Sequence, residues 1–204
     1  MIKAIIFDLG GIIVPEKGNQ IRKELCKYLN IKEKTFLHLF NPQIKILTTG
    51  KITLLNFYSY LKKRLKLPIK PRNILKEHLR LYKKYSTRKN KKVINLIKEL
   101  KRKYNVVSLS NTEIEIKNYN RRNGLFKIFD KKFNSTDLHL MKPDQEIFFK
   151  VLKTLKYTPK EVIFIDDKKI NIIQARKIGI NSILFKNFYQ LKNNLTIMLY
   201  KETS

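Results

Sequence analysis

The most constraining feature of this chain is a buried-strand pattern near its start that ends in an aspartate and then turns sharply. Residues 4–14 read AIIFDLGGIIV. A short run of Ile and Phe is typical of a central strand in a parallel sheet. Asp8 stands where this strand ends, and the pair Gly10-Gly11 predicts an abrupt turn that lets backbone N–H groups face a ligand.

A carboxylate at the end of such a strand has two interpretations. In open α/β sheets, ligands bind in the crevice beyond the carboxyl ends of the strands, which makes Asp8 a candidate site residue. Many strands also end in Asp-x-Gly simply to form a turn. The first strand alone leaves both alternatives open, so the other strand ends have to decide.

Three later segments carry polar side chains at comparable places. They are residues 104–112, which end in Ser110, Asn111 and Thr112; residues 140–148, where Lys142 precedes a helix start; and residues 162–167, which end in Asp166 and Asp167. Because the carboxyl ends of parallel strands meet at one edge of a sheet, the carboxylates at the strand ends, Asp166 and Asp167, are expected to converge with Asp8.

Taken together and in this order, the four motifs resemble those of the haloacid dehalogenase (HAD) superfamily. The runs that carry the resemblance are Asp8-Leu9-Gly10-Gly11, Leu109-Ser110-Asn111-Thr112, Lys142-Pro143-Asp144-x-x-Ile147-Phe148 and Ile165-Asp166-Asp167-x-x-x-Asn171-x-x-x-Ala175-x-x-x-Gly179. The resemblance extends from residue 2 to about residue 186. Its Phe-Asp-Leu-Gly motif is similar to that of the α-glucose-1-phosphatase-like branch of subfamily I.

The spacing of apolar residues predicts an α/β fold with a Rossmann-like parallel sheet. Short apolar runs predict strands at 2–8, 104–109, 162–166 and 181–185, with a further short strand near 132–134. A period of 3.6 predicts helices at 90–103, 113–123, 144–156 and 168–178, the last of them ended by Gly179. Strands alternating with helices of this length imply right-handed βαβ units.

Residues 15–88 break this rhythm, because they contain no strand pattern. They predict amphipathic helices at 19–30, 33–40, 53–66 and 71–85, punctuated by prolines. The resemblance implies that this all-helical insert is a type-1 cap subdomain, with the core domain formed by 1–14 and 89–204. Residues 187–204 predict a terminal helix with a frayed end.

Composition places this chain among intracellular proteins. A chain of 204 residues is long enough for one domain with a subdomain. The single cysteine, Cys26, leaves no disulfide framework and favours a reducing, cytoplasmic location. Neither a signal peptide nor a membrane span is predicted, and we expect a soluble monomer or homodimer.

The formal net charge of +29 has two interpretations. One is a polyanionic partner such as nucleic acid or an anionic membrane surface. The other is a coding bias, since Lys, Asn and Ile are all over-used and the lysines are spread along the whole chain. Non-specific binding to polyanions would follow from the charge in either case.

The resemblance also implies roles for individual residues. Asp8 would be the nucleophile, and the site would bind Mg²⁺ through the Asp8 carboxylate, the Gly10 carbonyl and Asp167, with Asp166 acting mainly through a metal-bound water. The residues expected to contact phosphate or substrate are Leu9, Gly10, Ser110, Asn111 and Lys142. The alternatives are helix N-caps for the Ser-Asn and Asp-Asp pairs and a surface charge for Lys142.

One departure from the family pattern bears on the chemistry. Most HAD phosphatases carry a second Asp two residues after the nucleophile, as general acid and base, whereas this chain has Gly10. Such a group typically contributes about 10²–10⁴-fold in rate. Glu16 and His38 are candidate replacements, and an exposed cap position is the alternative for each. His139 also stands where relatives usually have Gly, and a solvent-facing histidine is expected there.

The sequence thus predicts a Mg²⁺-dependent phosphatase of a small phosphorylated metabolite, such as a sugar phosphate, that acts through an aspartyl-phosphate. A 2-haloacid dehalogenase is an alternative, because halide leaves without a proton. A non-catalytic HAD protein that binds polyanions is a third hypothesis. Dependence on Mg²⁺ separates the first from the second, and the substrate is not readable from the cap helices.

Overall fold

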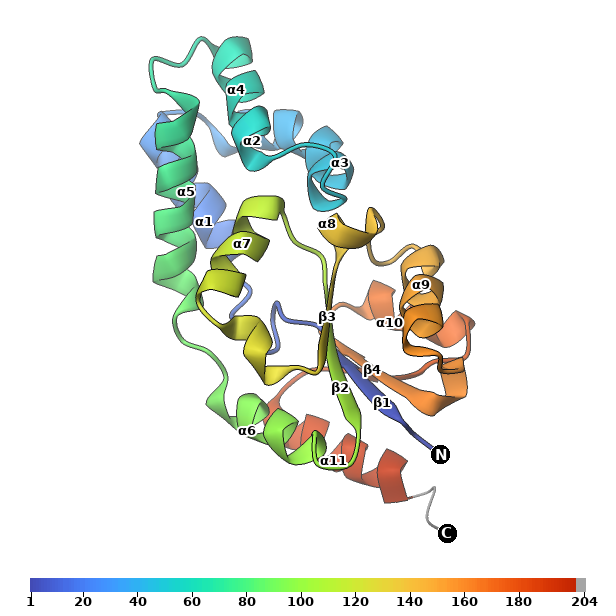
Figure 1. The fold of residues 1–204 in the computed structure, drawn as a ribbon. Helices are drawn as coiled ribbons and strands as arrows, with labels where there is room; N and C mark the ends of the chain where they lie inside the picture. The colour runs from blue at the N-terminus through green and yellow to red at the C-terminus, as the bar shows by residue number, and fades with distance from the viewer. Residues whose placement is uncertain (201–204) are drawn as a thin grey trace.

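The computed structural model describes residues 1–200, and its centre is a parallel β-sheet (Figure 1). The strands are β1 (Ala4–Phe7), β2 (Asn105–Ser110), β3 (Lys131–Asn134), β4 (Val162–Asp166) and β5 (Asn181–Leu184). Their order in the sheet is β3-β2-β1-β4-β5, and every neighbouring pair is parallel. The predicted Rossmann-like α/β fold is confirmed, with β1 in the centre as its apolar run indicates.

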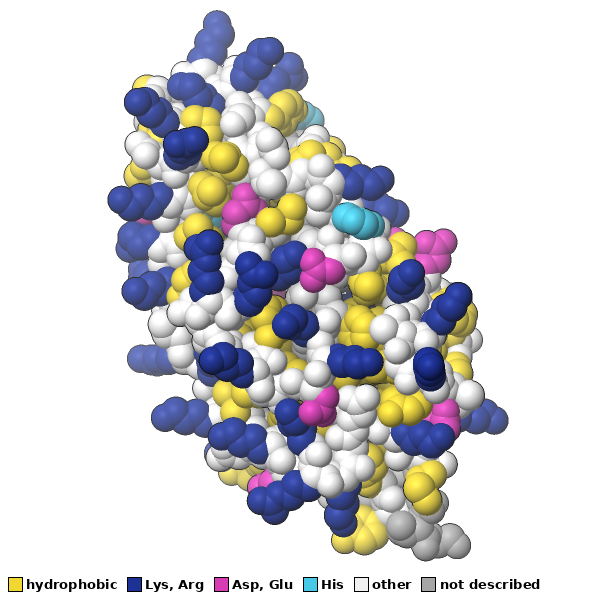
Figure 2. All heavy atoms as spheres, viewed as in Figure 1, with side chains coloured by type: hydrophobic (Ala, Val, Ile, Leu, Met, Phe, Trp, Pro, Cys, Tyr) yellow, Lys and Arg dark blue, Asp and Glu magenta, His cyan; other side chains and the backbone are white. Residues whose placement is uncertain are grey.

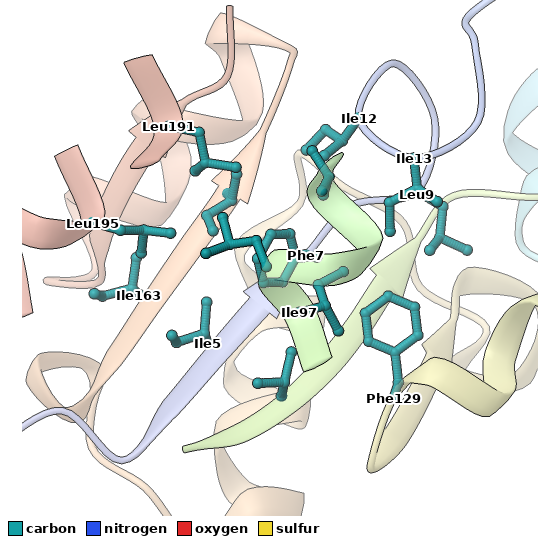
Figure 3. Packing of buried hydrophobic residues seen from close by; sticks show 14 of the residues in the cluster. Ile5, Phe7, Leu9, Ile12, Ile13, Ile97, Phe129, Ile163, Leu191 and Leu195 are labelled. Carbon is teal, nitrogen blue, oxygen red and sulfur yellow. The ribbon is translucent and has the colours of Figure 1, made fainter. Parts of the chain in front are cut away.

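Helices cover both faces of this sheet because successive side chains of β1 point to opposite sides. Ile5 and Phe7 face α6 (Lys91–Leu100) and α11 (Phe188–Tyr200), as Figure 3 shows with Ile97, Leu191 and Leu195 around them. Ala4 and Ile6 face α9 (Gln145–Leu155) and α10 (Lys169–Lys177). Burying each large apolar side chain contributes about 1.5–3 kcal/mol, so the sheet is held on both sides.

The ends of the core helices follow the predicted signals. Helix α10 is stopped by Gly179, whose φ of 87° lies in the left-handed region that favours glycine. Helix α7 (Ile114–Arg122) follows β2, and the short helix α8 (Ser135–Leu138) follows β3. The predicted terminal helix is α11, and its expected frayed end at 201–204 lies outside the described residues.

Residues 15–88 form helices and contain no strand, as predicted. They contain α1 (Gly18–Leu29), α2 (Glu33–Phe40), α3 (Ile44–Thr48), α4 (Leu54–Leu65) and α5 (Pro71–Ser86). These helices share an apolar cluster of their own, with Leu25, Phe57, Leu61 and Leu81 almost fully buried. In Figure 1 the insert lies at the top, away from α6 and α11.

Polar contacts dock this insert onto the core. The Glu115 carboxylate on α7 accepts hydrogen bonds from Leu54 N and Leu55 N at 3.1 and 3.2 Å, so a core residue caps the first turn of α4. Ser135 Oγ donates to Thr48 O at 2.6 Å. The insert is therefore tied to the core at two separate places.

His139 adds a third tie. Its backbone is left-handed, with φ at 57°, which accounts for the glycine that HAD proteins usually carry at this place. The side chain is exposed, as expected, and Nδ1 lies 3.0 Å from Thr49 O. The histidine thus joins the loop before Lys142 to the helical insert.

Basic side chains are spread over the visible surface. Figure 2 shows Lys and Arg side chains over both the insert and the core, and neither part of the visible face is without them. This distribution is what the sequence indicates, and it marks out no single basic groove on the visible face. Within residues 1–200, no helix has the length and apolar character needed to cross a bilayer.

Candidate active site

A buried lysine and two buried aspartates meet at the carboxyl ends of β1 and β4. Lys142 Nζ lies 2.9 Å from Asp8 Oδ1 and 2.7 Å from Asp166 Oδ2, and it donates to Leu109 O at 2.8 Å. Lys142 is only 2 % exposed, so it is not the surface charge that a random lysine would be. The convergence predicted for these strand ends is what the structure shows.

Burial and neighbouring charges shift the titration of this cluster. Burial raises the pKa of Asp8 to about 6; Lys142 opposes that shift and Asp166 adds to it. Burial alone would lower the pKa of Lys142, but the two carboxylates raise it above the ordinary lysine value. Lys142 is therefore a fixed cation that holds one oxygen of Asp8.

The two adjacent acids at the end of β4 have different surroundings. Asp166 is fully buried and accepts hydrogen bonds from Asn171 Nδ2 at 2.9 Å and from Lys168 N at 2.8 Å, besides its pair with Lys142. Asp167 Oδ1 is buried, and no described residue donates a hydrogen bond to it. Burial, with Asp166 adding to it, raises the pKa of Asp167.

This arrangement fits a divalent cation. Asp8, Asp166 and Asp167 each offer a carboxylate oxygen, and these atoms lie within 4.8 Å of one another. Several hard oxygen ligands are what Mg²⁺ prefers. A buried carboxylate oxygen without a hydrogen-bond donor is costly unless a cation satisfies it, and Asp167 Oδ1 is such an atom.

We expect the two acids to differ when each is replaced. Asp167→Ala removes the oxygen without a partner, so Mg²⁺ affinity measured by calorimetry should fall by at least about tenfold with little change in the melting temperature. Asp166→Ala leaves Lys142 and Asn171 short of an acceptor, so it should cost about 1–3 kcal/mol of stability with a smaller loss of affinity. Equal losses of affinity would contradict this division of roles.

Asn111 fixes the loop that carries Lys142. Its Nδ2 donates to Lys142 O at 2.7 Å, and its Oδ1 accepts from Lys142 N at 3.0 Å. This pair of bonds positions Lys142 and leaves only one N–H of the amide for a ligand. Ser110 Oγ has only a long contact of 3.5 Å, to Asn111 O, so its hydroxyl is the more available donor.

The alternative role of Ser110 and Asn111, as helix N-caps, is not what the structure shows. Helix α7 has Glu113 at its N-cap position and no side-chain cap bond. Helix α10 likewise has Lys168 at its N-cap position, although the Lys168 N–H donates to Asp166. Asp166 thus combines the turn role with its place in the charged cluster.

The two glycines after Asp8 differ in a way that the sequence does not reveal. Gly11 has a φ of 71°, and its N–H donates to Val14 O at 2.8 Å inside the turn. The expectation that this amide faces a ligand is therefore wrong for Gly11. Gly10 is not among the residues with positive φ, so its backbone accepts a side chain.

Gly11→Ala is expected to damage the acidic cluster. A Cβ at position 11 would lie 2.1 Å from Asp167 Oδ2, and the left-handed backbone adds about 1 kcal/mol of strain. Asp167 would have to move, so Mg²⁺ affinity should fall together with stability. Gly124→Ala has the same backbone conformation with open contacts of 3.7 Å or more, and as a control it should change stability alone.

A cavity of about 450 Å³ lies between these strand ends and the helical insert. Besides Asp8, Ser110 and Lys142, its lining includes Glu16, Tyr58, His78, Tyr82, Glu113 and Asn120. Both replacement candidates, Glu16 and His38, are exposed, as their alternative interpretation expects. Only Glu16 also lines the cavity.

Two polar pairs in the cavity wall were not predicted. Tyr58 OH hydrogen-bonds His78 Nδ1, and burial lowers the pKa of this histidine to about 4, so the ring is neutral. Tyr82 OH and the Asn120 amide lie 2.9–3.1 Å apart. The partners come from separate helices, and no local pattern in the sequence links them.

The fold agrees with what comparisons with known proteins find. A model of the haloacid dehalogenase-like hydrolases matches residues 2–179. The chain belongs to this family of hydrolases. The match spans β1 to β4, the helical insert and all four motifs, and it leaves out β5 and α11.

Individual relatives are more distant. The chain is 25% identical over 208 residues to a D-ribitol-5-phosphate phosphatase from Bacteroides thetaiotaomicron, covering 98% of this chain and 99% of that protein. A crystal structure of a HAD family enzyme from the same organism, in complex with magnesium and inorganic phosphate, superposes with a TM-score of 0.76. It is 26% identical and covers 91% of this chain and 95% of that one.

A further match is local. Drimenol cyclase drtB from Aspergillus calidoustus is 36% identical over 69 residues, which are 34% of this chain and 13% of that protein. The chain therefore spans about an eighth of the length of this relative.

Proposed function

We propose that the protein is a Mg²⁺-dependent phosphatase that hydrolyses a small phosphorylated metabolite through an aspartyl-phosphate on Asp8. The observation that carries this proposal is the Asp8 carboxylate, with Oδ1 held 2.9 Å from a buried lysine beside an acidic cluster that includes Asp167. Fixing a carboxylate in this way lowers the entropic cost of an in-line attack on phosphorus, which supports the proposal.

The residues divide the work as follows. Lys142 and the Ser110 hydroxyl stabilise the charge on the phosphoryl oxygens, and Asn111 holds Lys142 in place. Asp8, the Gly10 carbonyl and Asp167 would hold Mg²⁺, with Asp166 acting mainly through a metal-bound water. The cation, when bound, offsets the repulsion between the attacking carboxylate and the phosphate. Leu9 and Gly10 line the cavity where the phosphate would lie.

The cavity supports a substrate such as a sugar or polyol phosphate. Its volume of about 450 Å³ suits a small metabolite, and its wall combines aromatic faces with hydroxyl, imidazole and amide groups. Hydroxyl-rich substrates are bound by such groups. The 25% identical relative is named for a phosphorylated polyol, which is in line with this class.

We also propose that residues 15–88 act as the cap, with 1–14 and 89–204 as the core, in the manner of a type-1 cap of subfamily I. The Phe-Asp-Leu-Gly wording favours the α-glucose-1-phosphatase-like branch. A cap over the strand ends excludes water from the reaction. The dehalogenase alternative is disfavoured because that reaction needs no metal, whereas Asp167 Oδ1 is free and buried in an acidic cluster.

A phosphatase assay tests the proposal. The protein should release phosphate from p-nitrophenyl phosphate in Mg²⁺ and lose activity in excess EDTA. A panel of sugar, polyol and acyl phosphates and nucleotides would then define the substrate. Activity that persists in EDTA would contradict the proposal, as would release of halide from a 2-haloacid without release of phosphate from any ester.

A further inference from the structure

The place of the missing second carboxylate is not empty. A Cβ at position 10 would lie 3.4 Å from Glu16 Oε2 and 3.9 Å from Asp8 Oδ2. An Asp at position 10 would project its carboxylate into the same space. The Glu16 carboxylate therefore reaches the side of Asp8 that a general acid and base would occupy, from a position six residues further along the chain.

The Glu16 side chain is oriented for this place. Its Oε1 accepts a hydrogen bond from Gly18 N at 3.2 Å, and Glu16 lines the same cavity as Asp8, Ser110 and Lys142. No ion pair within residues 1–200 involves Glu16, although the chain carries 45 Lys and Arg against 16 Asp and Glu. An acid that remains unpaired beside the nucleophile is available for proton transfer.

We propose that Glu16 is the general acid and base of the reaction, in place of the absent Asp. This inference rests on the phosphatase function proposed above. In the first step Asp8 Oδ attacks phosphorus, the bond from phosphorus to the leaving oxygen breaks, and the Glu16 carboxyl gives its proton to that oxygen. In the second step the Glu16 carboxylate takes a proton from water, whose oxygen attacks the phosphoryl group and releases phosphate and the Asp8 carboxylate.

The backbone at Gly10 allows a direct test, in which the carboxylate is moved from position 16 to position 10. Gly10 has no positive φ. Within residues 1–200, and apart from its chain neighbours, a Cβ there would have two atoms within 4 Å: one carboxylate oxygen of Glu16 and one of Asp8. An Asp at position 10 therefore fits when the Glu16 side chain is shortened to Ala, which frees the space that the carboxylate occupies. In the wild type the same substitution would place two carboxylates together, and it should gain little.

The experiment compares Glu16→Gln, Glu16→Ala, the double variant Gly10→Asp/Glu16→Ala and the control Glu99→Gln, which changes an exposed glutamate on α6. Each is assayed with p-nitrophenyl phosphate, which has a good leaving group, and with a simple alkyl phosphate. Glu16→Gln should lower kcat on the alkyl phosphate by about 10²-fold, and phosphorylated Asp8 should accumulate with p-nitrophenyl phosphate, as detected by mass spectrometry. Relative to Glu16→Ala, the double variant should regain at least about tenfold of the lost rate.

Other outcomes overturn the inference. If the wild type is an active phosphatase and Glu16→Gln behaves like Glu99→Gln, Glu16 has no part in the mechanism. The proposed phosphatase function would then still stand. If Glu113→Gln, and not Glu16→Gln, lowers kcat on the alkyl phosphate, the proton transfer belongs to Glu113, a half-buried glutamate in the cavity wall. A drop in Mg²⁺ affinity of Glu16→Gln by calorimetry would make Glu16 a metal ligand. A wild type that hydrolyses no phosphate ester would overturn both proposals.

Discussion

Asp8→Asn is expected to lower turnover by at least about 10³-fold while the fold is kept. The amide preserves the shape of the side chain and an oxygen near Lys142, but it is not a nucleophile for phosphorus. The loss should appear in kcat, because the groups that bind phosphate stay in place. Activity against p-nitrophenyl phosphate in Mg²⁺ measures it, and a variant that keeps more than a tenth of the wild-type rate would rule out the aspartyl-phosphate route.

The same substitution should stabilise the metal-free protein. Burial raises the pKa of Asp8 to about 6, above its ordinary value of 3.8, so between these two pH values the folded state holds a proton that the unfolded chain has lost. Stability therefore falls as the pH rises from 3.8 to about 6, and the full cost remains at neutral pH, because folding then buries the charged carboxylate. At neutral pH in EDTA, Asn at position 8 should therefore raise the melting temperature.

A matched control isolates this effect. Asp137→Asn removes an exposed carboxylate that pairs with Lys117 at 2.5 Å, and the pKa of Asp137 is lowered by Lys117 and Asn134 against the effect of burial. That substitution should lower the melting temperature slightly and leave turnover unchanged. A fall in the melting temperature for both variants would mean that the Asp8 charge does not oppose folding.

Much of the core could be predicted because its signals are local. The apolar runs of β1 and β4 are buried on both faces, so they read as strands without any knowledge of their partners. The edge strand β3 has exposed Lys131 and Lys132 beside buried Phe133, and only its pairing with β2 defines it. Helix α3 has five residues, too few for a period of 3.6 to be recognised.

The meeting of Asp8 and Asp166 could be predicted because parallel strands end at one edge. Lys142 lies in a loop before α9, and only the resemblance of its Lys-Pro-Asp-x-x-Ile-Phe run pointed to it. The separate roles of these residues could not be predicted, because they depend on side-chain rotamers and on partners far apart in the chain. Asn111 reads as a phosphate donor from sequence, yet it bonds both backbone groups of Lys142. Gly11 has a positive φ and Gly10 does not, and this difference also could not be predicted, because the turn geometry sets it and both residues are glycines.

Lys142→Met should have the largest effect on stability. The substitution removes the cation between two buried carboxylates and keeps a side chain of similar length. Breaking a buried ion pair on one side typically costs about 3–5 kcal/mol, because the remaining charges lose their compensation. Urea unfolding in EDTA measures the loss, and turnover should fall as well, since the phosphoryl oxygens would lose their buried cation.

A double variant shows whether the carboxylates are the cause. If the loss arises from repulsion between Asp8 and Asp166, Lys142→Met/Asp8→Asn should recover a large part of it, because Asp166 keeps its donors from Asn171 and Lys168. The two substitutions would then be strongly non-additive. Additive losses would instead indicate that Lys142 stabilises the fold through packing and its bond to Leu109 O, and that the charges at the strand ends are compensated by other means.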